Sequence, residues 1–141
     1  VLDAALEIAA PLLDQGRHAV TRDIPETVLP LDADHDRLAQ VFANLLGNAA
    51  KYSPPGQPIE ISVACRDGRV RTAIRDHGIG LTAEQAARVF ELFAQVDTSI
   101  ERSHGGLGIG LTLVRKLVEM HGGSVQVDSA GLGQGCRFVV D

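Results

Sequence analysis

The most informative part of this sequence reads Asn44-Leu45-Leu46-Gly47-Asn48-Ala49-Ala50-Lys51-Tyr52-Ser53-Pro54. Its apolar residues continue a helical periodicity that begins before it, and Ser53-Pro54-Pro55-Gly56 ends the pattern. Asp32 or Asp34 is placed to cap this helix at its start. The side that we expect to face the core comprises Leu38, Phe42, Leu45, Leu46 and Ala49. A long core helix that ends near Tyr52 is therefore predicted.

A second side of the same helix carries Asn44, Asn48 and Lys51, next to the apolar side. Asparagine is unfavourable inside helices because its side chain competes for backbone hydrogen bonds, so two asparagines one turn apart indicate a functional role. An amide oxygen is a suitable neutral ligand for Mg²⁺, which takes its other oxygens from water and substrate phosphates. The alternative is that both asparagines simply face solvent.

A β-hairpin follows this helix. Ile59, Ile61 and Val63 alternate with polar residues, and the alternation resumes over 70–74 after Asp67-Gly68, a typical hairpin turn. The other expected elements are helices over 1–16, 82–90 and 107–121, strands over 18–24, 124–129 and 137–140, and an aperiodic polar segment over 94–106 that we expect to be mobile. We predict a two-layer α/β (α+β) sandwich, with about three helices packed on a mixed, mostly antiparallel sheet of about five strands.

The composition fits one domain over residues 1–141, since 45% of the residues are hydrophobic and 22% are charged. A formal net charge of −5 excludes a broad basic surface, so we expect neither nucleic-acid binding nor direct membrane contact. Cys65 and Cys136 match no metal-ligand spacing and are too few for a disulfide framework, which favours a cytoplasmic location. Val1 is no initiator methionine, and neither a leader nor a membrane-spanning run is present, so we expect a soluble piece of a longer protein.

Asp76 extends the alternation that points Thr72 and Ile74 inward. A carboxylate in that position needs a hydrogen-bond donor. Gly78 and Gly80 follow it, and glycines permit unusual backbone angles and the close approach of a flat ligand. Asp76 is therefore a candidate ligand-binding residue, and a turn-forming aspartate at a strand end is the alternative interpretation.

A dense run of glycines, Gly105-Gly106-Leu107-Gly108-Ile109-Gly110, stands between the polar segment and the last predicted helix. Free backbone N–H groups and the helix dipole attract phosphate at such a helix start. The run lacks the Lys-Ser/Thr of a Walker loop, and no strand precedes it as a dinucleotide-binding fold requires. We predict a phosphate cradle; a flexible loop before a glycine-tolerant helix end is the alternative.

Five further side chains are weaker candidates. Arg102 and His104 precede the glycines and would reach a terminal phosphate, unless they are simply solvated. Phe90 and Phe93 would pin the root of the polar segment to the core, or only pack there. Tyr52 would stack on a base, or pack at the end of its helix.

Taken in order, these motifs resemble those of sensor histidine kinases. Residues 44–54 are similar to their asparagine box, Asp76-His77-Gly78-Ile79-Gly80 to their first glycine box, Phe90-Glu91-Leu92-Phe93 to their phenylalanine box, and Gly106-Leu107-Gly108-Ile109-Gly110-Leu111 to their second glycine box. The closing Gly133-Gln134-Gly135-Cys136-Arg137-Phe138 fits as well, so the resemblance covers essentially the whole chain. It implies the catalytic ATP-binding domain of the GHKL superfamily, with the Bergerat fold and a flexible ATP lid over about 94–106.

The resemblance also implies a site for ATP and Mg²⁺. Asp76 would receive the adenine amino group, Asn48 would ligate Mg²⁺, and the remaining residues would line the base pocket or lie beside the phosphates. Leu107 and Cys136 depart from the family pattern, because hydroxyl residues are usual there, and each puts one polar contact in doubt. The implied ATP-binding residues are Asn44, Asn48, Lys51, Tyr52, Asp76, Gly78, Gly80, Phe93, Arg102 (to the γ-phosphate), Gly106, Leu107, Gly108, Ile109, Gly110, Leu111 and Cys136.

The resemblance bears on the reaction too. Gyrase-like, mismatch-repair and heat-shock chaperone ATPases share the fold but carry a glutamate one turn before the Mg-binding asparagine, where this chain has Asn44. An amide is no general base, which favours phosphoryl transfer over rapid hydrolysis. The histidines His18, His35, His77, His104 and His121 all lack the His-Glu/Asp-x-x-Arg/Thr-x-Pro context of the family's phosphoacceptor.

We therefore expect the chain to bind ATP without autophosphorylating. It would phosphorylate a histidine on a separate dimerisation domain of a homodimeric parent, from which a response regulator receiver domain takes the phosphoryl group. A GHKL-type ATPase and a non-catalytic nucleotide-sensing module are the alternatives.

Overall fold

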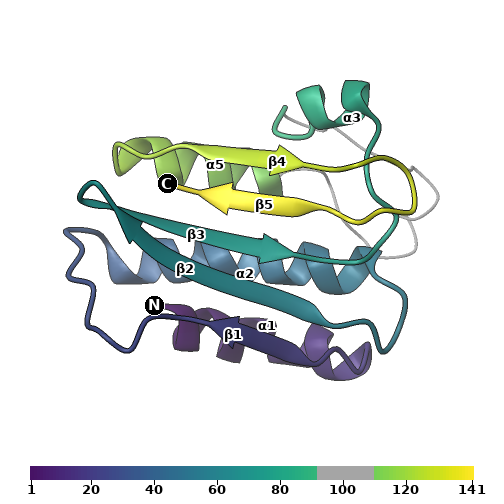
Figure 1. Ribbon diagram of the computed structural model, residues 1–141, viewed down its shortest axis with the longest axis horizontal. Helices are drawn as coiled ribbons and strands as arrows, with labels where there is room; N and C mark the ends of the chain where they lie inside the picture. The colour runs from purple at the N-terminus through teal and green to yellow at the C-terminus, as the bar shows by residue number, and fades with distance from the viewer. Residues whose placement is uncertain (92–109) are drawn as a thin grey trace.

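The chain folds into two layers, a sheet and the helices that cover one of its faces (Figure 1). The computed structural model describes residues 1–91 and 110–141. The helices within these ranges are α1 (Leu2–Gln15), α2 (His35–Tyr52), α3 (Ala83–Arg88) and α5 (Gly110–Met120). The strands are β1 (Val20–Asp23), β2 (Ile59–Arg66), β3 (Arg69–Arg75), β4 (Val125–Asp128) and β5 (Arg137–Val140). The predicted α/β sandwich is confirmed.

The five strands lie in the order β1-β2-β3-β5-β4. β1 runs parallel to β2, with Val20 opposite Ile59, and the other neighbours are antiparallel. The β2–β3 hairpin turns at Asp67 and Gly68, whose φ angles of 52° and 75° are those of the turn type that matches the twist of two antiparallel strands. The sheet is therefore mixed and mostly antiparallel, as the alternation of apolar residues predicts.

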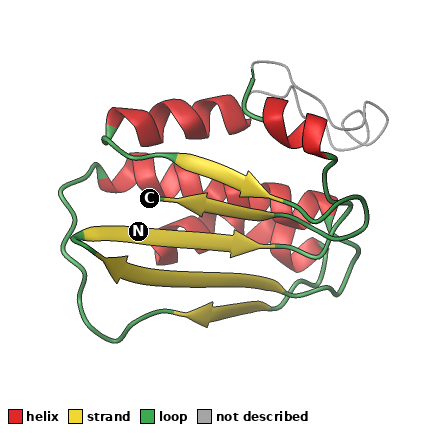
Figure 2. Cartoon of the chain, turned by 45° about the horizontal axis from the view of Figure 1, so that its top comes forward, coloured by secondary structure: helices red, strands yellow, loops and turns green. Residues whose placement is uncertain are grey.

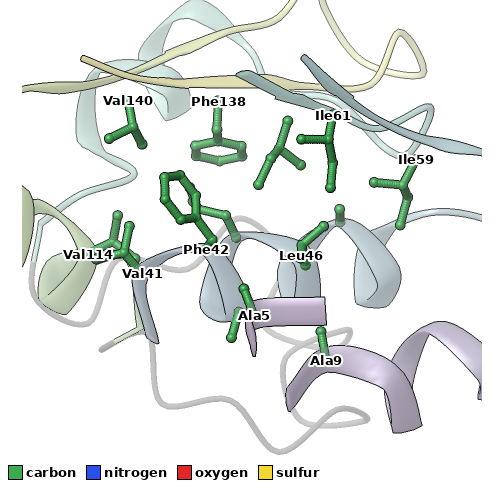
Figure 3. Close-up of a cluster of buried hydrophobic side chains, with 14 of the residues drawn as sticks. Ala5, Ala9, Val41, Phe42, Leu46, Ile59, Ile61, Val114, Phe138 and Val140 are labelled. Carbon is green, nitrogen blue, oxygen red and sulfur yellow. The ribbon is translucent and has the colours of Figure 1, made fainter. Parts of the chain in front are cut away.

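Helix α2 forms the centre of the core, where it contacts both α1 and α5 (Figure 3). Its start is settled by Asp34, whose Oδ1 accepts a hydrogen bond from the Arg37 N–H at 3.0 Å. Asp34, and not Asp32, is thus the capping residue. The predicted apolar side is confirmed, since the following residues are all buried: Leu38, Phe42, Leu45, Leu46 and Ala49.

Helix α1 forms although it contains Pro11, which lacks the N–H that an interior helix position donates. Tertiary packing stabilises the helix, because Ala5, Ala9 and Leu13 are buried on the side that packs against α2. Burial of this apolar side offsets the cost of the proline, as is usual for helices in folded domains. The predicted helix over 1–16 is therefore correct to within one residue at each end.

The other differences from prediction lie at element ends. The strand expected from residue 18 begins at Val20, and Thr82 is the capping residue of α3, where its side chain and that of Gln85 form a capping box. The segment over 94–106 and the expected helix start over 107–109 lie outside the described residues. Within the described ranges, no helix is long and apolar enough to cross a membrane.

Candidate functional site

Four chain segments meet at one end of the domain, and each carries predicted site residues. They are the C-terminal end of α2, the C-terminal end of β3, the start of β5 and the first turn of α5 (Figures 1 and 2). Segments that are far apart in the sequence are therefore brought together: the Asp76 N–H donates to the Cys136 carbonyl, and the Ile79 N–H donates to the Tyr52 carbonyl at the end of α2.

Asp76 follows β3 directly and is only 5% exposed. Its Oδ1 accepts two backbone hydrogen bonds, from the Gly78 N–H at 2.9 Å and from the Cys136 N–H at 3.2 Å. Its other carboxylate oxygen, Oδ2, accepts no hydrogen bond from any residue that the structure describes. Asp76 thus points inward, as the alternation predicts, and one of its oxygens remains available to a ligand.

The environment of Asp76 disfavours its charge. Burial raises the pKa of the Asp76 carboxyl above its ordinary value, and the two backbone hydrogen bonds and the nearby His77 oppose this shift only in part. A buried carboxylate that is held by two backbone N–H groups and keeps one oxygen without a hydrogen bond from the described residues is a candidate binding group.

Backbone contacts join the end of α2 to the loop after Asp76. The Ile79 N–H donates to the Tyr52 carbonyl at 3.1 Å. Gly78 lies so close to the same carbonyl that a Cβ atom there would stand 2.1 Å from the oxygen. The first glycine of the motif is therefore required by close packing of two backbones, and this contact fixes Asp76 relative to α2.

Gly78→Ala tests this contact. We expect the substitution to lower the free energy of unfolding by about 1–3 kcal/mol, because either the helix end or the loop must move to admit the methyl group. Chemical denaturation with urea measures the change. Gly47→Ala is the matched control, since its Cβ would meet only Leu12 Cδ1, at 3.4 Å. Alanine is favoured inside helices, so the control should not be less stable; equal effects of the two variants would contradict this account.

The predicted residues of α2 lie along its partly exposed side. Asn44, Asn48, Lys51 and Tyr52 are all half-buried, whereas their neighbours Leu45, Leu46 and Ala49 face the core. Asparagine side chains at a solvent boundary remain able to bind a ligand. Within the described part of the chain, no group of three or more histidine, cysteine or acidic side chains is arranged to hold a metal.

The glycine-rich run is described only at its end. Gly110 is the first residue of α5 and is exposed, and Leu111 is partly buried against the core. The helix start that the phosphate-cradle prediction concerns, over 107–109, lies outside the described residues. The remaining predicted residues of this region lie outside the described residues: Phe93, Arg102, His104, Gly105, Gly106, Leu107, Gly108 and Ile109.

Cys136 lies beside Asp76 at the start of β5. Burial and the negative charge of Asp76 raise the pKa of the Cys136 thiol to about 12, with a hydrogen bond to the Ser129 side chain opposing the shift. The thiol is therefore protonated at neutral pH, so it is not a nucleophile. The weak hydrogen-bonding capacity of sulfur replaces the hydroxyl that the resemblance leads one to expect at this position.

Two residues near this end were not predicted from the sequence. His18 is 8% exposed, and its ring nitrogens lie 2.8 Å from the Gln57 carbonyl and 3.1 Å from the Ala50 carbonyl, so it links the end of α1 to the end of α2. Ser129 bonds to backbone groups of two loops. A serine at a strand end before a glycine-rich loop is the one sequence signal for such a role.

A cavity of about 680 Å³ lies at the opposite end of the sheet. Its lining includes Val1, the hairpin turn at Gly68, and Gly122 after α5, and it includes none of the predicted site residues. Some of the polar groups that line it are paired with each other, as Arg22 is with Asp3 at 2.8 Å. This cavity is separate from the candidate site.

Comparison with known proteins identifies the family. The family model described as "Histidine kinase-, DNA gyrase B-, and HSP90-like ATPase" matches residues 33–141. The chain belongs to this family. Among curated relatives of this ATPase domain, the circadian input-output histidine kinase CikA of Synechococcus elongatus is 43% identical over 108 residues, which cover 77% of this chain and 14% of CikA.

Solved structures agree with this assignment. The mycobacterial sensor histidine kinase MprB superposes with a TM-score of 0.77 at 27% identity, covering 95% of this chain and 90% of that one. Full-length ShkA in complex with AMPPNP gives 0.79 at 29% identity, covering 98% of this chain and 28% of that one. The chain spans 14%, 18% and 33% of the lengths of three sensor histidine kinases that it matches. The predicted resemblance to the catalytic domain of histidine kinases is confirmed.

Proposed function

We propose that this histidine kinase ATPase domain binds Mg-ATP where α2, β3, β5 and α5 meet, and donates the γ-phosphoryl group to a histidine of a separate dimerisation domain. The observation that carries this proposal is the state of Asp76. Two backbone N–H groups hold its Oδ1, while Oδ2 accepts no hydrogen bond from the described residues. The adenine amino group would donate to Oδ2 and so select the base.

The groups that would bind the phosphates of ATP lie on α2 and α5. Asn44 and Lys51 would lie beside the phosphates, and the exposed backbone at Gly110 would face them at the start of α5. Asn48 would hold Mg²⁺ through its amide oxygen. The fit rests on the chemistry of the donor, since an amide oxygen at a half-buried position is a hard neutral ligand and Mg²⁺ takes further oxygens from phosphates and water. When bound, Mg²⁺ would neutralise phosphate charge.

Transfer to a supplied histidine is favoured over hydrolysis. Asn44 occupies the position where a hydrolase would carry a glutamate to activate water, and an amide accepts no proton as a base. The described histidines are engaged within the domain: His18 with two carbonyls, His77 with Glu60, His121 with Leu117, and His35 with Asp36. His104 lies outside the described residues, but none of the five histidines has the sequence context of the family's phosphoacceptor, so the acceptor would belong to another domain.

The parent protein would be a homodimeric sensor kinase of a two-component system. Its dimerisation domain would supply the histidine, and a response regulator receiver domain would then take the phosphoryl group. We place the ATPase domain in the cytoplasm, where ATP is available. The names of several relatives, among them the histidine kinase CikA, the sensor histidine kinase WalK and the sensor protein SrrB, support this assignment.

A reconstitution experiment tests the transfer. The chain is mixed with the separately prepared dimerisation domain of its parent and γ-labelled ATP, and acid-labile label on histidine is followed with time. We expect label on the dimerisation domain and none on the chain alone. ATP binding without transfer would support a nucleotide-sensing module instead, and rapid release of free phosphate by the isolated chain would support a hydrolase.

A further inference from the structure

The antiparallel pairing of β3 with β5 continues past the ends of the two strands. The Asp76 N–H donates to the Cys136 carbonyl at 2.9 Å, the Gly135 N–H to the Gly78 carbonyl at 3.1 Å, and the Gly133 N–H to the Ile79 carbonyl at 2.7 Å. Residues 76–80 and 131–136 therefore form one joined structure, which we name the paired loops. The Cys136 N–H that holds Asp76 Oδ1 belongs to it.

The Ser129 hydroxyl lies where the paired loops converge beyond these bonds. It accepts from the Leu81 N–H at 3.0 Å and donates to the Gly135 carbonyl at 2.7 Å. The Gly131 N–H also donates to it, at 3.3 Å. One side chain thus bonds to backbone on both sides of the paired loops, and only a hydroxyl combines a donor and an acceptor in so small a group.

The loops approach each other closely at this point. A Cβ atom on Gly80 would stand 2.1 Å from the Gly131 carbonyl oxygen and 3.2 Å from Ser129 Oγ. A Cβ atom on Gly135 would stand 2.1 Å from the Asp76 carbonyl oxygen. The glycines permit this approach but supply no side chain to maintain it; the Ser129 hydroxyl bonds across it here, as Asp76 Oδ1 does nearer the strand ends.

We propose that Ser129 is a positioning residue for base recognition, which rests on the proposed function of Asp76. Its hydroxyl fixes Gly135, and Gly135 precedes the Cys136 N–H that orients the Asp76 carboxylate. Without the hydroxyl, the Gly135–Cys136 peptide loses its link through Ser129 to Leu81, so the Cys136 N–H that donates to Oδ1 is held less firmly. The carboxylate then presents Oδ2 to the base less accurately, while the phosphate-side groups on α2 and α5 are unaffected.

The test compares ligands that differ in whether they carry a base for Asp76 to recognise or only the phosphates. Dissociation constants for ATP, GTP and magnesium tripolyphosphate are measured by calorimetry on the chain, its Ser129→Ala variant, and two controls. Ser129→Thr keeps the hydroxyl, and Ser124→Ala removes an exposed hydroxyl at the other end of β4. For Ser129→Ala we expect ATP to bind about tenfold more weakly, with tripolyphosphate unchanged, so that the preference for ATP over GTP falls.

The controls keep the two proposals distinguishable. Ser129→Thr and Ser124→Ala should retain the wild-type preference for ATP over GTP. An equal loss for ATP, GTP and tripolyphosphate in Ser129→Ala, or no loss at all, would show a purely structural role and overturn the inference. Failure of the unaltered chain to bind ATP would instead overturn the proposed function.

Discussion

Asp76→Asn is expected to weaken ATP binding by about 10²-fold, because it removes a charged hydrogen-bond acceptor and replaces it with a donor. The expected loss of affinity follows from the bonds of Oδ1, which accepts from the Gly78 and Cys136 N–H groups. In the variant the amide oxygen must remain at that position to accept the same two bonds. The amide nitrogen then occupies the position of Oδ2, where two donors, its own N–H and the adenine amino group, face each other.

The same variant should fold normally, which separates binding from stability. Burial raises the pKa of Asp76 in the folded state, so its ionisation costs free energy at neutral pH. The stabilising contribution of Asp76 is therefore present at low pH and is lost as the pH rises through the raised value. Asparagine stays neutral, and the thermal midpoint of the ligand-free variant at pH 7 should equal or exceed that of the unaltered chain. A lower midpoint would assign the loss of binding to misfolding.

The pH dependence of ATP binding has the opposite sign to that of the stability contributed by Asp76. Oδ2 accepts from the base amino group best when the carboxyl is ionised, so ATP affinity should fall as the pH decreases through the raised pKa of Asp76. The fall should begin at a higher pH than for an ordinary aspartate, whose pKa is about 3.9. Calorimetric titrations between about pH 4 and pH 8 measure it, and the inflection should be missing from the Asp76→Asn variant.

Local sequence signals predicted most of the fold because they act over short distances. The hairpin turn at Asp67-Gly68 and the cap at Asp34 each depend on side chains within a few residues. Helix α1 was predicted in spite of Pro11 because its apolar period outweighs a single breaker. The sequence alone does not distinguish Asp32 from Asp34 as the capping residue, because the distinction depends on the backbone geometry at Asp34.

A residue of the candidate site could be predicted from the sequence where the alternation along a single strand determines the direction of its side chain. Alternation along β3 pointed Asp76 inward, and the structure places it there. The roles of Ser129 and His18 could not be predicted, because both side chains bond to backbone groups, which every residue type has. These partners are Leu81, Gly135, Ala50 and Gln57. Contacts of this kind depend on tertiary structure, and local periodicity cannot reveal them.

Asn48→Ala is expected to reduce histidine phosphorylation by about 10²–10³-fold in the reconstituted system, because the proposed Mg²⁺ ligand is lost and the phosphates are no longer held in line. Binding of ATP in the presence of EDTA should be almost unchanged, since the base contact at Asp76 does not involve Asn48. Added Mg²⁺ should strengthen ATP binding to the unaltered chain and have little effect on the variant. Calorimetry with and without the ion separates the two contributions.

Gln40→Ala is the matched control, since it removes an amide from a half-buried position two turns earlier on the same side of α2. It lies towards the end of the helix that is distant from Asp76, so transfer and the Mg²⁺ effect should both be retained. If Asn48→Ala weakened ATP binding equally with and without Mg²⁺, Asn48 would be a general contact of the nucleotide and not the ligand of the ion. If Gln40→Ala reproduced the loss of transfer, the effect would arise from the helix as a whole. The assignment of Asn48 therefore requires both the dependence on the ion and the difference between the two amides.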